Sequence, residues 1–104
     1  MLKVYGSEMC PDCKACKANF EANGIDFEFI DINTSLHNLA AFLKLRDTKP
    51  VFEKWKAVGD IGIPGIVGED GEVFTDWESY LKEKGFPVTY RESGKACSIT
   101  GKGC

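Results

Sequence analysis

The sequence predicts an α/β domain with a mixed four-stranded β-sheet, and two patterns support this prediction. The first is a strand, a helix and a second strand in succession, at residues 2–5, 11–23 and 25–32. The two strands of such a unit lie parallel and are joined by a right-handed crossover. The second pattern is an antiparallel hairpin over residues 66–74, in which Asp70-Gly71 is a favoured turn sequence.

Three further helices complete the expected order of β-α-β, two helices, β-β and α, so that helices flank the sheet. The second helix follows an N-cap within residues 33–35, and its apolar residues recur at helical spacing. A short third helix is expected at residues 51–58. The last helix covers residues 77–84, with Thr75 or Asp76 as its N-cap.

The motif Cys10-Pro11-Asp12-Cys13 lies where the first strand gives way to the first helix. Pro11 suits the first position of a helix, where its missing N–H would have no intrahelical partner anyway. Cys10 then lies at the helix N-terminus, where unpaired backbone N–H groups and the helix dipole favour the thiolate over the thiol. Cys13, one turn later, comes within disulfide reach of Cys10. We therefore predict a redox site in which Cys10 is the nucleophile and Cys13 the resolving thiol.

A metal site is the alternative for this motif, because half of a zinc ribbon has the same spacing of cysteines. The remaining candidate ligands are Cys16, His37, Cys97 and Cys104, and they form no second pair at matching spacing. Redox chemistry is therefore favoured. Cys16 is expected to be an inert core thiol, and His37 is remote in sequence from the motif. Three alternatives stay open for Cys97 and Cys104: they act as an extra thiol relay, they bind a metal ion as a clasp, or they have no defined role.

Composition indicates one soluble domain in a reducing compartment. Because the net charge of the 104 residues is -3, nucleic acid and anionic membranes are not expected as partners. No apolar run is long enough to cross a membrane, and no leader pattern precedes the first strand. Five cysteines, three of them in one predicted helix, do not suit a disulfide framework. We expect a cytoplasmic monomer with a folded domain at residues 1–90 and a flexible tail at residues 91–104.

The order of elements, the Cys-Pro-x-Cys motif and Ile63-Pro64 ahead of the hairpin resemble the glutaredoxin family of the thioredoxin fold. The resemblance covers about residues 2–85. It implies that Pro64 is a cis proline beside the active cysteines and that the backbone of Ile63 pairs with the cysteinyl part of glutathione. It also implies that Thr75 and Asp76 bind the γ-glutamyl carboxylate, as free N–H groups at a helix start would allow. Glutathione is then the reductant or co-substrate, and no metal is expected.

Two aspartates depart from the pattern of that family. Asp12 replaces the usual aromatic residue between the cysteines, and Asp60 stands where a polar or basic residue is usual. Both add negative charge where an anionic tripeptide is expected to bind, so recognition of glutathione should be weaker but not absent. The charge of Asp12 should also disfavour the Cys10 thiolate.

The predicted function is reduction of protein disulfides or glutathione mixed disulfides by a glutathione-dependent thiol–disulfide oxidoreductase that uses Cys10 and Cys13. Its expected partners are glutathione and disulfide-containing proteins. Two alternatives remain at this stage. One is a thioredoxin-like electron donor that does not use glutathione, and the other is an iron–sulfur or zinc carrier that uses the same cysteines without turnover.

Overall fold

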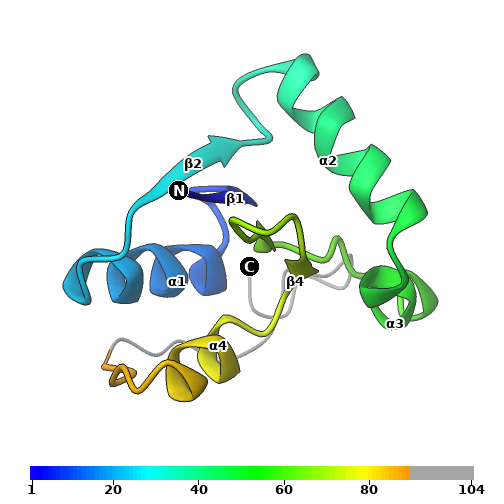
Figure 1. The fold of residues 1–104 in the computed structure, drawn as a ribbon. Coiled ribbons are helices and arrows are strands. Elements are labelled where there is room, and N and C mark those ends of the chain that lie inside the picture. The colour runs from blue at the N-terminus through cyan, green and yellow to red at the C-terminus, as the bar shows by residue number, and fades with distance from the viewer. Residues whose placement is uncertain (90–104) are drawn as a thin grey trace.

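The computed structural model describes residues 1–89 and confirms the predicted fold class (Figure 1). The strands lie in the order β2-β1-β3-β4, with β1 parallel to β2 and the other neighbours antiparallel. The elements are β1 (Leu2–Gly6), α1 (Pro11–Ala22), β2 (Phe27–Asp31), α2 (Leu36–Thr48), the 3-10 turn η1 (Pro50–Phe52), α3 (Glu53–Ala57), β3 (Gly65–Val67), β4 (Val73–Phe74) and α4 (Trp77–Glu83).

Helices pack on both faces of the sheet, with α1 and α4 on one side and α2 with α3 on the other (Figure 1). Alternation along β1 divides the core between these faces. Leu2 and Val4 join a cluster with Phe20 of α1 and Leu81 of α4. Tyr5 points the other way, into a cluster that contains Phe42 and Phe52 and also both cysteines of the motif. The Cys10–Cys13 motif therefore lies in the half of the core that α2 and η1 cover.

Local chemistry explains where the helices begin and end. The Ser35 hydroxyl accepts a hydrogen bond from the Asn38 N–H at 3.3 Å and so caps α2, within the predicted N-cap segment. Asp76 caps α4 by accepting from the Ser79 N–H at 3.1 Å. Gly24 follows α1 with φ at 68°, a left-handed conformation that glycine adopts at little cost and that ends the helix.

Several predicted boundaries were wrong by a few residues. β2 begins at Phe27 instead of residue 25, because the Ile25 N–H still bonds to the Phe20 carbonyl in the turn that closes α1. α2, for which no end was predicted, ends at Thr48, where the hydroxyl donates to the Lys44 carbonyl at 2.6 Å. The predicted third helix is divided into η1 and α3, and α4 ends at Glu83.

The last described residues are held against α1. The side-chain oxygen of Asn19, which is fully buried, accepts from the Thr89 N–H at 2.8 Å. Asn23 donates to the Pro87 carbonyl at 3.1 Å, and Val88 packs on the first core cluster. The predicted tail at residues 91–104, with Cys97 and Cys104, lies outside the described residues. Within residues 1–89, no helix combines the length and apolar character needed to cross a membrane.

Candidate active site

Cys10 is the N-cap residue of α1. Its backbone is extended, with φ at -101° and ψ at 118°, and Pro11 occupies the first helical position, as predicted. The Cys10 carbonyl accepts the first intrahelical hydrogen bond, from the Lys14 N–H at 3.1 Å. The sulfur atom is thus held beside the first turn of α1, where backbone N–H groups and the positive end of the helix dipole stabilise negative charge.

Cys13 lies one turn into α1 and is hydrogen-bonded to Cys10. This hydrogen bond is the main reason that the pKa of Cys13 is raised well above its ordinary value, and burial raises it further. The charges of Cys10 and Cys16 act in the same direction, while a hydrogen bond with the Ser7 backbone opposes them. Cys13 therefore keeps its proton and can donate it to the Cys10 sulfur, which is the arrangement that stabilises a thiolate on Cys10.

Gly6 makes room for the Cys13 thiol at the end of β1. A Cβ atom on Gly6 would lie 2.9 Å from the Cys13 Sγ and 3.2 Å from a ring carbon of Phe29. Cys10 and Cys13 are both fully buried free thiols. Neither thiol is therefore exposed to solvent in this structure.

Cys16 belongs to a different core cluster from Cys10 and Cys13. It is fully buried among the residues that α1 and α4 place on their face of the sheet. Burial, followed by the charge of Asp12, raises its pKa well above the ordinary value for a thiol. Within residues 1–89, no group of three or more His, Cys, Asp or Glu side chains is arranged to hold a metal ion.

A pocket of about 230 Å³ brings together all four residues that were predicted to contact glutathione. The Ile63–Pro64 peptide bond is cis, as the resemblance implied. Ile63 is 2% exposed and packs in the same cluster as Cys10 and Cys13, which places the pocket beside the motif. The lining residues are Asp12, Lys54, Trp55, Gly62, Ile63, Pro64, Thr75, Asp76, Trp77 and Glu78.

Two tryptophans fix the polar side chains of this pocket. Trp77 is nearly fully buried and donates its indole N–H to the Asp12 carboxylate at 3.2 Å, which joins the motif to the start of α4. Trp55 donates to the Thr75 hydroxyl at 3.2 Å. Burial raises the pKa of Asp12 to about 6, although the Trp77 hydrogen bond lowers it, and the charges of Glu78 and Asp76 add to the rise.

The charges around the pocket differ in part from the prediction. Asp12 lines it as expected, but Asp60 is not among the lining residues. The cation at the pocket is Lys54, whose ammonium lies 5.0 Å from the centre of the Trp55 ring. Lys17, on α1, pairs with Glu8 at 2.6 Å and does not line the pocket. His37 lines a different surface pocket, between β2 and α2.

Comparison with known proteins shows which family the chain belongs to. The family model described as glutaredoxin matches residues 2–52, which hold the motif and the first four elements with η1. An uncharacterized protein of Haemophilus influenzae is 37% identical over 73 residues, which is 70% of this chain and 85% of that protein. The chain belongs to the glutaredoxin family.

The pocket of this glutaredoxin includes residues that the sequence did not indicate as binding residues. Trp55 and Trp77 line it beside the residues expected to contact glutathione. Lys54 and Glu78 had not been singled out, because a charged residue on a short helix is usually only solvated. The one sequence signal for them is their place directly beside Trp55 and Trp77.

Proposed function

We propose that this glutaredoxin reduces disulfides through Cys10 and Cys13, and that glutathione mixed disulfides are among its substrates. The Cys10 thiolate attacks one sulfur of the substrate disulfide, and the other sulfur leaves as a thiolate that takes up a proton. Cys13 then loses its proton and attacks the Cys10 sulfur, which releases the second substrate thiol. The substrate gains two electrons and two protons, and the protein is left with a Cys10–Cys13 disulfide.

The observation that carries this proposal is the hydrogen bond between the two thiols at the start of α1. It supports different roles for two otherwise similar residues. The proton that Cys13 holds stabilises the Cys10 thiolate before attack. Once Cys10 is in a mixed disulfide it no longer bears charge, so the main cause of the raised Cys13 pKa is removed and Cys13 becomes easier to ionise.

Glutathione is proposed as the reductant because the pocket joins the motif to Ile63, Pro64, Thr75 and Asp76. In this proposal the Ile63 backbone pairs with the cysteinyl part of the tripeptide, and the start of α4 receives its γ-glutamyl part. Asp12 weakens binding, because its carboxylate lies in the same pocket as the anionic ligand. Two molecules of glutathione reduce the Cys10–Cys13 disulfide and become oxidised glutathione. The further proposals are a cytoplasmic location and a monomer.

A coupled assay tests this function and separates it from a thioredoxin-like donor. The acidic side chains Asp12, Asp76 and Glu78 in the pocket are the observation that favours such a donor, because a protein disulfide does not require an anion site. The protein is supplied with a glutathionylated peptide and regenerated either by glutathione with glutathione reductase or by thioredoxin reductase. Turnover with glutathione is the expected result. Turnover sustained by thioredoxin reductase alone would replace glutathione dependence by the thioredoxin-like function.

A further inference from the structure

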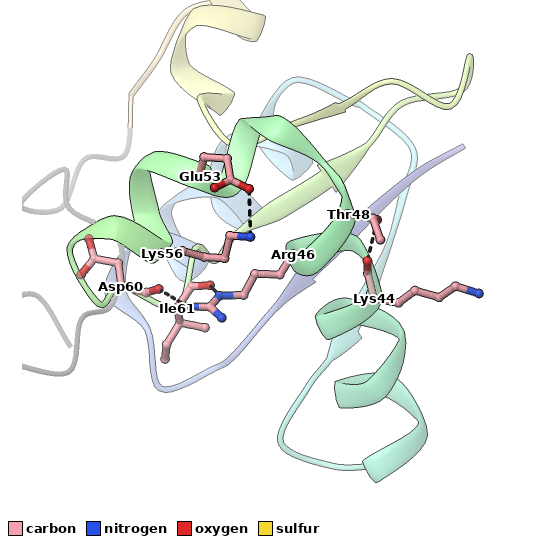
Figure 2. A network of polar contacts seen from close by, with 7 residues as sticks. All are labelled: Lys44, Arg46, Thr48, Glu53, Lys56, Asp60 and Ile61. Carbon is pink, nitrogen blue, oxygen red and sulfur yellow. Dashed lines mark hydrogen bonds and ion pairs between the residues drawn. The ribbon is translucent and has the colours of Figure 1, made fainter.

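Arg46, in the last turn of α2, holds the loop that leads to the cis proline. Its Nε donates to the Ile61 carbonyl at 3.0 Å, and its Nη2 donates to the Asp60 carbonyl at 2.9 Å. Figure 2 shows the side chain reaching from α2 to this loop, while that of Lys44, on the same helix, points away from it. A planar guanidinium that donates two parallel hydrogen bonds fixes direction as well as distance.

The same loop is also tied to α3. The Asp60 N–H donates to the Trp55 carbonyl at 2.8 Å, and the Gly59 N–H donates to the Lys56 carbonyl at 3.2 Å. Lys56 is in turn paired with Glu53 at 2.9 Å. The amide of Asp60 is therefore held by one helix and its carbonyl by another, so the loop has little freedom to turn as a unit.

Gly62 joins this loop to Ile63 and has a constrained backbone. Its φ is 93°, and a Cβ atom on it would lie 3.0 Å from the Phe52 Cδ1, so this buried glycine is confined against an aromatic core residue. Ile63 follows with its side chain buried beside Cys10 and Cys13. The backbone of Ile63 is thus set by the core on one side and by the Arg46 hydrogen bonds two residues upstream on the other.

We propose that Arg46 is a positioning residue for substrate, which sets the Ile63 backbone to receive an extended peptide next to the Cys10 sulfur. This rests on the proposed function, in which that backbone pairs with the cysteinyl part of the substrate. Arg46 does not line the pocket and does not touch the thiols, so it acts through the loop.

The test compares Arg46→Met with Arg46→Lys, with Lys44→Met as a control that removes an exposed cation from the same helix. Steady-state rates are measured on a glutathionylated peptide and on a small aromatic disulfide that has no peptide backbone to pair. Arg46→Met should raise KM for the peptide about 5- to 10-fold and change kcat less than about twofold. The rate on the aromatic disulfide should stay unchanged. Arg46→Lys should recover part of the loss, because an ammonium can donate to one of the two carbonyls.

Three outcomes would overturn the proposal. The first is an unchanged KM for the peptide in Arg46→Met. The second is an equal loss of rate in Arg46→Met on both substrates, whether or not the melting temperature falls. The third is a KM in Lys44→Met that matches that of Arg46→Met. Failure of the proposed function would differ from all of these, because the wild-type protein would then not reduce the glutathionylated peptide.

Discussion

Asp12 is a half-buried carboxyl group whose ionisation should oppose folding. Burial is the largest cause that raises its pKa, from 3.8 to about 6, despite the hydrogen bond from Trp77. Between these two values the folded protein holds a proton that the unfolded chain has lost. The contribution of Asp12 to stability therefore falls as the pH rises from 3.8 to about 6, and the penalty is complete above that.

Substitution of Asp12 by Asn should remove this penalty. Asparagine is neutral, and its side-chain oxygen can still accept the hydrogen bond from Trp77 Nε1. A rise of two pKa units corresponds to about 3 kcal/mol. Screening by water at this partly exposed side chain, and the lost attraction to the N-terminus of α1, reduce the expected gain to about 1 kcal/mol. For a domain of this size that is a rise in melting temperature of roughly 4–8 °C.

Thermal unfolding followed by circular dichroism, under reducing conditions, measures this gain across the pH range of the titration. Asp12→Asn should melt higher than the wild-type protein at neutral pH, and the difference should vanish as the pH falls to that of an unperturbed carboxyl group. Asp26→Asn, at an exposed carboxylate, is the matched control and should show no such dependence. A difference that is constant with pH, or a lower melting temperature for Asp12→Asn at neutral pH, would show that burial does not dominate at this carboxyl.

Three further predictions follow from the geometry of the described residues. Gly6→Ala should lower the free energy of unfolding by about 1–3 kcal/mol and slow formation of the Cys10–Cys13 disulfide, because the new methyl group meets the Cys13 sulfur. Wild-type values in both assays would contradict the close approach of Gly6 to Cys13. Truncation after residue 90 should change the free energy of unfolding by less than about 0.5 kcal/mol. Truncation after residue 86 should lower it by about 1–3 kcal/mol, since buried Asn19 loses a hydrogen bond. Equal free energies of unfolding for the two truncated chains would refute this. Asp12→Asn should lower the pKa of Cys10 in a thiolate absorbance titration, and a rise would show that the Asp12 charge does not act on that sulfur.

The sequence was sufficient where the determining interactions are local. Pro11 at the first helical position predicted that Cys10 would lie at the start of α1, and residues 33–35 were predicted to hold the N-cap of α2. The structure confirms both. The hairpin was predicted by its turn residues, and the structure pairs Ile66 with Phe74 across it. These features depend on backbone conformations that a few neighbouring residues determine.

Contacts between distant segments were beyond sequence reasoning. The hydrogen bond between Asp12 and Trp77 spans 65 positions, and nothing in either local sequence indicates it. Arg46 looks like an ordinary basic residue at a helix end, where it would favour the dipole of α2, and only the fold brings two carbonyls to its guanidinium. The helical pattern of α2 also suggested more burial than the fold provides, since Leu36 is 84% exposed.

In the proposed mechanism Cys10 attacks and Cys13 resolves, and trapping the intermediate tests these two roles most directly. Cys13→Ser and Cys10→Ser are each exposed to oxidised glutathione, and the modified cysteine is identified by peptide mapping and mass spectrometry. Cys13→Ser should carry one glutathionyl group on Cys10 and should still turn over a glutathionylated peptide, because glutathione itself can resolve the adduct. Cys10→Ser should carry none on Cys13 and should be inactive. A glutathionyl group on Cys13, or equal activity in the two variants, would contradict the assignment.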